Sequence, residues 1–450
     1  MNLGALRSAD YRRYFLGNVF ALNGMWICRI TLAWLAWEST RQAGFVGLVA
    51  FLIFAPTLVS GPFFGVLADR VSLKRGALAI QSGIAATAGA MLVAAALDIL
   101  SPALLALLAL TLGIVTSAHH PVRLALSPSL VTRDAIASAI ALGAINFNLA
   151  RLSGPALGGF IIATAGAHWA LLLSALSFLP NLVILPSLRP RADLGTRSEG
   201  SVFSALGAGI RHAAESPLIR RAMLAVGCVS LVPRALLEVL PVLADGVFNR
   251  GAAGLGVLTA ASGAGALAAA SFIALRPGQP PGHLPLSSRI AAPAAVLIVV
   301  ALAWNKSWPA AVALITALGL CGTLVGVGLQ SSIQLVLPDA FRARVMSLWT
   351  MVTIGGSALG SILLGTLIDV LGMQMALTGA AGGALVGLAA LLATPLATAP
   401  EPRRSEGTRT KPAPTHPHPE PLPDDNHARN RPRCPAQGGV AGRTWQYRRR

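Results

Sequence analysis

The sequence predicts an all-α membrane protein with twelve transmembrane helices, arranged as two six-helix halves related by pseudo-two-fold symmetry. Hydrophobic residues make up 54% of the chain and charged residues only 12%, whereas soluble domains carry about 25% charged residues. The apolar residues gather in about twelve runs that are long enough to cross a bilayer. A polar stretch at 189–216 separates the first six runs from the last six.

The first half is predicted from six apolar runs of roughly 18–25 residues. Arg7, Arg12 and Arg13 precede the first run, which is too long for a signal peptide and has no clear cleavage site. The fifth run is long, so we expect its helix to be tilted. The six predicted helices are 14–37, 45–68, 77–98, 103–120, 136–164 and 168–187.

The second half repeats the first weakly. The loops before the fifth and the eleventh run both place polar and basic residues, such as Arg133 and Arg342, just ahead of a glycine-rich helix. Duplicated six-helix halves are the architecture in which transporters alternate access to a site at the membrane midplane. The ninth run is the shortest of the second set. The six predicted helices are 218–243, 254–275, 290–305, 309–330, 345–370 and 373–396.

Four parts are therefore expected along the chain. They are an N-terminal six-helix half at 1–188, a cytoplasmic connector at 189–216, a C-terminal six-helix half at 217–396 and a basic tail at 397–450. Pro, Arg, Thr, His and Gly dominate the tail, and almost nothing apolar remains there. Burial cannot offset the entropy of ordering such a segment, so we expect the tail to be disordered and cytoplasmic.

The basic residues orient the predicted bundle. Most Lys and Arg before position 397 fall in loops on the side of the N-terminus, and only Arg41, Arg250 and Lys306 fall in loops on the other side. The positive-inside rule then places both termini in the cytoplasm. We expect a multi-pass protein of the inner (cytoplasmic) membrane that is a monomer. This placement explains the net charge of +18. The expected partners are a small-molecule substrate, protons and the lipid bilayer, with no nucleic acid.

The loop between the second and third runs is strongly charged, and such charges cannot lie in hydrocarbon. It resembles the loop G-x-x-x-D-R-x-x-R-R/K of the major facilitator superfamily. The residues that match are Gly65, Asp69, Arg70 and Lys74. Leu73 replaces the first Arg of the family pattern, and Arg75 adds a charge one position later. The resemblance implies a gating loop, with Asp69 close to Ser347 at the start of the eleventh helix.

The fifth run contains a small-residue motif, which resembles the helix-5 signature G-x8-G-x3-G-P-x2-G-G of the drug-antiporter branch of that superfamily. The matching residues are Gly154, Pro155, Gly158 and Gly159. Ala141 and Ala150 replace the two earlier glycines. Small residues let helices approach closely and proline bends a helix, so the motif predicts a kinked helix with a smooth sliding face. Ordinary small-residue packing is the alternative.

Four further segments, 10–18, 33–38, 121–123 and 342–347, are similar to the bacterial enterobactin-exporter-like permeases of the superfamily. The resemblance covers residues 5–395. It implies proton-driven export of a siderophore, a drug-like compound or a related metabolite. An uptake permease of the same fold, or a membrane sensor or secretion accessory that does not transport, is the alternative.

Glu238 is the deepest acidic residue of the predicted bundle, and Arg234 lies four residues earlier on the same helix face. An ionisable residue inside the membrane is a functional candidate by default. Glu238 therefore either carries the coupling proton or forms a structural ion pair with Arg234.

Arg29 and Arg151 have no acidic partner on their own helices, so each must face protein or water. Helices 1, 4, 7 and 10 line the cavity in a fold of two halves. We therefore expect Arg29, with Asn23 and Trp26, to give the substrate cavity a cation beside an aromatic face, which suits an anionic aromatic ligand. An ion pair from Arg29 to Glu238 across the halves is the alternative. Arg151 is expected to brace the fifth helix, with substrate binding as its alternative.

Enzyme signatures are missing from the sequence. It contains no nucleotide-binding P-loop, zinc-hydrolase motif or nucleophile elbow. We therefore expect no enzymatic activity, no catalytic residue, no metal and no cofactor, and energy from a gradient.

Overall fold

The computed structural model describes residues 4–68, 72–190, 202–276 and 282–393, and all regular secondary structure in these ranges is helical. The helices belong to a compact unit that spans residues 1–397. The predicted disordered tail lies outside the described residues. The fold of twelve transmembrane helices in two halves is the one that the apolar runs predicted.

The helices of the first half follow the predicted runs closely. The fourth run is the exception, because its helix continues beyond residue 120 after a break at Ala118. Pro121 has no N–H to donate to the carbonyl of Ser117, which accounts for a break at this point. The helices are α1 (Ala9–Thr40), α2 (Ala43–Ala68), α3 (Leu73–Ala96), α4 (Pro102–Ser117), α5 (His119–Ser129), α6 (Ile136–Ala165) and α7 (Ala167–Ile184).

The second half begins with a discontinuous seventh helix. It starts as α9 (Pro217–Val229), turns into a π-helical segment η4 (Ser230–Arg234), unwinds, and ends in a second π-helical segment η5 (Val242–Val247). The later helices are continuous and match their runs. They are α10 (Gly251–Ala274), α11 (Leu286–Trp304), α12 (Trp308–Val336), α13 (Asp339–Leu371) and α14 (Met373–Ala393).

The connector contains a helix that the sequence analysis did not predict, α8 (Val202–Glu215). This helix packs against the start of α13, where the His212 and Phe341 rings stack with centroids 4.4 Å apart. Its apolar residues recur at helical spacing, but the helix is much shorter than a membrane span. A search for long apolar runs therefore classified the whole stretch as polar.

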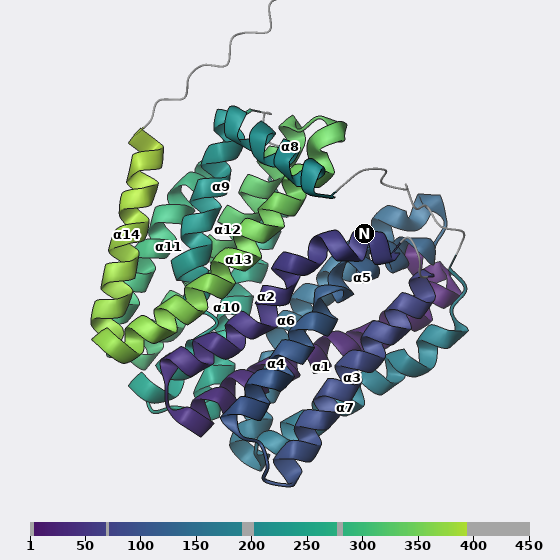
Figure 1. The fold of residues 1–450 in the computed structure, drawn as a ribbon, viewed down its shortest axis with the longest axis horizontal. Coiled ribbons are helices and arrows are strands. Elements are labelled where there is room, and N and C mark those ends of the chain that lie inside the picture. The colour runs from purple at the N-terminus through teal and green to yellow at the C-terminus, as the bar shows by residue number, and fades with distance from the viewer. Residues whose placement is uncertain (1–3, 69–71, 191–201, 277–281, 394–450) are drawn as a thin grey trace, which may run out of the picture. The chain divides into compact units, whose positions relative to one another are not determined.

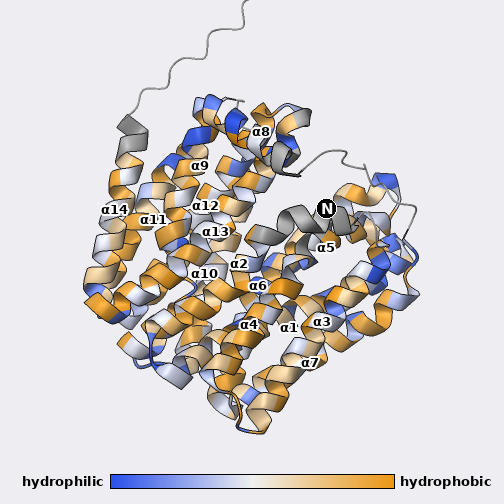
Figure 2. Ribbon diagram, viewed as in Figure 1, coloured by the Kyte–Doolittle hydropathy of each residue, from blue (hydrophilic) through white to orange (hydrophobic). Residues whose placement is uncertain are grey.

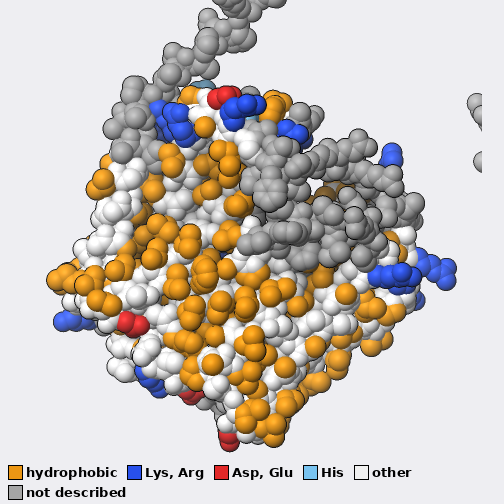
Figure 3. All heavy atoms as spheres, viewed as in Figure 1, with side chains coloured by type: hydrophobic (Ala, Val, Ile, Leu, Met, Phe, Trp, Pro, Cys, Tyr) orange, Lys and Arg blue, Asp and Glu red, His pale blue; other side chains and the backbone are white. Residues whose placement is uncertain are grey.

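The outer surface of the bundle suits a bilayer. Eight described helices are long and apolar enough to span a membrane, and three shorter apolar helices accompany them. Large apolar side chains such as Phe160 and Val386 point outward, 65% and 71% exposed. Figure 2 shows hydrophobic residues along the middle of the helices, and Figure 3 shows the charged side chains near the edges of the visible face.

The two halves meet along two helix pairs. α2 runs beside α13 and α6 runs beside α10, and these pairs form the most extensive contacts between the halves (Figure 1). Both contacts use the ends of the helices that lie near the α1–α2 turn at residues 41–42. We call this end of the bundle the distal end, and the end that holds the N-terminus the proximal end.

Candidate functional site

The break in the seventh helix places Arg234 and Glu238 at the interface between the halves. Pro233 and Pro241 lack the N–H groups that would continue an α-helix. Between them the backbone N–H groups donate to the carbonyl three residues earlier instead of four, as Glu238 N–H does to the Ala235 carbonyl at 3.0 Å. Arg234 ends the first π-helical segment, and Glu238 lies in the unwound stretch. Discontinuous membrane helices form the substrate and ion sites of many transporters.

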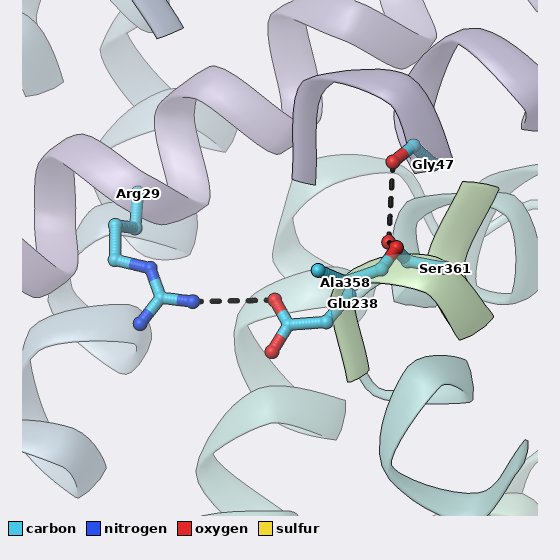
Figure 4. Close-up of polar contacts among 5 residues, drawn as sticks. All are labelled: Arg29, Gly47, Glu238, Ala358 and Ser361. Atoms are coloured by element: carbon cyan, nitrogen blue, oxygen red, sulfur yellow. Dashed lines mark hydrogen bonds and ion pairs between the residues drawn. The ribbon is translucent and has the colours of Figure 1, made fainter. Parts of the chain in front are cut away.

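The partner of Glu238 is Arg29 of α1, in the other half. The Nη2 atom of Arg29 lies 3.2 Å from Oε2 of Glu238 (Figure 4). The sequence analysis allowed two partners for Glu238, Arg234 on the same helix and Arg29 in the other half, and the structure has the ion pair with Arg29. The expected pair with Arg234 assumed a regular helix, in which residues four apart share a face, and the unwound backbone removes that register.

Two further arginines surround this ion pair. Arg234 interacts electrostatically with Glu238 and Arg29. Arg151 of α6 interacts with all three of these residues. We call Arg29, Arg151, Arg234 and Glu238 the central charge cluster. Arg151 was expected to brace the fifth helix or to bind substrate. Its place in this cluster was not predicted, because the four residues come from three helices that are far apart in the sequence.

Aromatic rings cover the guanidinium of Arg29. The Cζ atom of Arg29 lies 4.8 Å from the ring centroid of Trp26 and 4.7 Å from that of Phe54 on α2. Trp26 in turn meets Phe147 of α6 edge-on, with the centroids 6.0 Å apart. The Nε1 donor of Trp26 is buried without a hydrogen-bond partner in the described structure. Trp26 thus lies beside Arg29, as expected.

Asn23 has a different position from its two expected neighbours. Its Oδ1 accepts a 2.7 Å hydrogen bond from Oγ of Ser153, and its Nδ2 donates to the Val19 carbonyl at 2.9 Å. Asn23 therefore fastens α1 to α6, and both ends of its amide are occupied. A substrate pocket with Asn23, Trp26 and Arg29 on one wall remains a prediction.

The small residues of α6 face two neighbours. A Cβ added at Gly154 would lie 2.6 Å from Cβ of Trp26, and one added at Gly158 would lie 2.7 Å from Cγ2 of Ile30, both on α1. A Cβ added at Gly159 would lie 2.5 Å from Cα of Gly256 on α10, in the other half. The motif therefore supplies close packing within the first half and across the halves. The kink at Pro155 remains a prediction.

Three of the five residues of the predicted gating loop lie in the described part of the chain. Asp69 and Arg70 lie outside the described residues, so the expected approach of Asp69 to Ser347 does too. Lys74 and Arg75 begin α3, and Arg75 is exposed. Gly65 lies on α2.

Two carboxylates of the second half hold the first half at the distal end. Asp369 of α13 accepts hydrogen bonds from the backbone N–H groups of Ala43 (2.8 Å) and Gly44 (2.7 Å), at the start of α2. Asp245 accepts a 2.9 Å hydrogen bond from Nε1 of Trp37 and forms an ion pair with Arg41. We call these contacts the distal latch.

Below the latch, Oγ of Ser361 donates to the Gly47 carbonyl at 3.2 Å (Figure 4). A Cβ added at Gly365 would lie only 2.4 Å from the Ala43 carbonyl oxygen. α2 and α13 therefore touch backbone to backbone, and the distal end of the bundle is closed. The sequence carries no signal for the partners of these two carboxylates, because the partners come from the other half.

Comparisons with known proteins agree with this architecture. A family described as transmembrane secretion effector matches residues 2–417. The enterobactin exporter EntS of Escherichia coli O1:K1 is 28% identical over 377 residues, which cover 82% of this chain and 87% of the exporter. The exporter of the same name from Shigella boydii serotype 4 has the same identity and coverage.

Solved structures share the fold at lower identity. A mutant of the nucleoside transporter NupG superimposes with a TM-score of 0.69 at 13% identity, covering 85% of this chain and 99% of that one. A bacterial homologue of the lysosomal transporter Spinster, inward-facing and occupied, gives 0.64 at 13% identity, covering 86% and 96%. Both are transporters of the predicted architecture.

Proposed function

Because the chain belongs to the transmembrane secretion effector family of the major facilitator superfamily, we propose that it exports a small molecule by proton-coupled alternating access. The protein is a secondary transporter and not an enzyme. A siderophore, a drug-like compound or a related metabolite is the proposed cargo, because the curated relatives are named enterobactin exporters. Uptake by the same fold, or a sensor or secretion accessory that does not transport, is the alternative.

The observation that carries the proposal is the ion pair between Arg29 and Glu238. It joins the two halves, and it lies where the seventh helix is discontinuous. Rocking of one half against the other changes the separation of any pair that spans them. A proton on Glu238 neutralises the carboxylate and weakens the pair, which gives proton binding a direct effect on the relative position of the halves.

The protein is a multi-pass membrane protein. We propose that both termini lie in the cytoplasm, on the basis of its basic loops, and that it is a monomer in the inner membrane, as its similarity to bacterial exporters suggests. The distal end then faces the outside, and the structure represents a state closed to the outside. In this arrangement Gly65, Asp69, Arg70, Lys74 and Arg75 serve as a gating loop on the cytoplasmic side.

Sealed vesicles of both orientations test this function. In everted vesicles, the exporter should accumulate members of a panel of siderophores and amphiphilic drugs when a proton gradient is imposed, and empty vesicles should not. Glu238→Gln should abolish the response to the gradient while substrate still exchanges. Accumulation only in right-side-out vesicles would identify an uptake permease, and no flux in either orientation would favour the sensor or accessory.

A further inference from the structure

We infer that the central charge cluster is a binding site for an organic anion, and that the Glu238 carboxylate occupies the place of this anion on Arg29 when the site is empty. The inference rests on the proposed transport function and specifies the chemical class of the substrate.

The charge balance of the cluster is the first argument. Three guanidinium groups, those of Arg29, Arg151 and Arg234, face the single carboxylate of Glu238. The neighbouring helices α2, α4, α10 and α12 carry no Asp, Glu, Lys or Arg. Uncompensated positive charge at membrane depth is expensive. A bound anion supplies the missing negative charge, whereas a cation would add to the imbalance.

The second argument is that the cluster is accessible. Arg234 is exposed, and the side chains of Arg29 and Glu238 keep 20% and 25% of their surface accessible. These three residues come from facing parts of the two halves, and Figure 4 shows Arg29 and Glu238 reaching toward each other between them. The interface is therefore not packed shut at the level of the ion pair.

The donors of Arg29 supply the third argument. A guanidinium carries five N–H donors, and the described contacts of Arg29 use one of them, toward Glu238. Its faces are covered by Trp26 and Phe54. A planar carboxylate on an aromatic ring matches both features, because a guanidinium binds carboxylates in pairs of hydrogen bonds and the adjacent rings offer stacking surface.

Competition for Arg29 then sets the affinity for the anion. The Glu238 carboxylate opposes the anion, both by holding Arg29 and by charge repulsion, so the anion must displace it. The charged groups that face Glu238 are Arg29, Arg151 and Arg234; at this level α13 presents Ala358 and Ser361, which do not titrate (Figure 4).

The test is equilibrium binding to the purified full-length chain in lipid nanodiscs, with three probes that share one ring system. The probes are 1-naphthoate, the neutral 1-naphthamide and the cationic 1-naphthylmethylammonium. We expect 1-naphthoate to bind at least about tenfold more tightly than the other two, a difference of the size that one charged contact produces. Equal binding of the three probes, or no binding of 1-naphthoate, would overturn the inference.

Variants separate the site from general electrostatics. Glu238→Gln should bind 1-naphthoate more tightly than the wild type, because the competing carboxylate is gone. Arg29→Lys should bind it more weakly than the wild type, since an ammonium cannot replace a planar bidentate donor. Lys306→Gln removes an exposed positive charge at the distal end and should change nothing. Weaker binding by a folded Glu238→Gln, or an equal loss in Lys306→Gln, would contradict the competition.

The outcomes for this inference and for the transport function are separable. Flux of neutral cargo in vesicles, together with no preference for the anion in nanodiscs, would leave the transport function standing without the anion site. Preferred binding of the anion, but without flux in either vesicle orientation, would leave the site standing without transport.

Discussion

The carboxylate of Asp369, at the end of α13, caps the start of α2 in the other half, with its Oδ2 2.7 Å from the backbone nitrogen of Gly44. A second bond, from the nitrogen of Ala43 to Oδ1, makes the cap bidentate. The first N–H groups of a helix have no partner inside the helix and carry partial positive charge. The distal end is therefore closed by a contact between a side chain of one half and the backbone of the other.

Asp369→Asn should loosen this closure. The amide keeps one acceptor but loses the charge, and a carboxylate at a helix start contributes about 0.3–2 kcal/mol. We expect a larger population with the distal ends apart. Spin labels at Gln42→Cys and Met375→Cys, in a chain without its native cysteines, measure this separation. Glu38→Gln removes an exposed carboxylate at the same end and serves as the matched control. An unchanged distance distribution in Asp369→Asn would show that the cap does not hold the halves together.

The two donors to Asp245, Trp37 and Arg41, should contribute unequally to the stability of the distal latch. Arg41 is 59% exposed, and exposed ion pairs contribute about 0–1 kcal/mol. The bond from Nε1 of Trp37 is partly buried, so its loss in Trp37→Phe should cost about 0.5–1.5 kcal/mol. Thermal unfolding in detergent should therefore rank Asp245→Asn as the least stable, then Trp37→Phe, then Arg41→Gln. If Arg41→Gln were less stable than Trp37→Phe, the exposed ion pair would contribute more to the latch than the hydrogen bond from Trp37.

The membrane-spanning elements could be predicted from the sequence because hydrocarbon imposes their length and polarity. The run 254–275 became Gly251–Ala274, and 136–164 became Ile136–Ala165. The break in the seventh helix was missed because an apolar run reports burial and not backbone hydrogen bonding. The sequence feature that could have predicted the break is the pair Pro233 and Pro241, which lie on either side of Glu238 within the same apolar run.

The partners within the site were harder to predict. Arg29 and Glu238 are separated by 209 positions and belong to different halves. The charge of each residue predicted that it needed a partner, but the choice between Arg29 and Arg234 depended on the local backbone. The distal latch was harder still to predict from the sequence. Asp369 accepts hydrogen bonds from backbone N–H groups, and every residue except proline has such a group.

Two glycines of α6 predict opposite effects of the same substitution. Gly159→Ala places a methyl group 2.5 Å from Cα of Gly256. This backbone contact cannot yield locally, so α6 and α10 must separate. Gly143→Ala on the same helix meets nothing within 4 Å, and alanine favours a helix interior by about 0.5–1 kcal/mol over glycine. We expect reduced transport and a lower melting temperature for Gly159→Ala, and wild-type transport for Gly143→Ala. Equal behaviour of the two variants would mean that the halves do not rely on this contact.

Restoring a regular seventh helix should disable the transporter without unfolding it. Pro233→Ala and Pro241→Ala together return two backbone donors and remove two ring clashes. The segment around Glu238 can then form α-helical bonds, which puts Glu238 on the face of Arg234 and away from Arg29. Transport in vesicles should fall strongly while the melting temperature stays level or rises. Glu238→Gln in this background should then have little further effect on transport, because the pair with Arg29 is already lost. Full transport by the double proline variant would show that the discontinuity does not position Glu238 for its function.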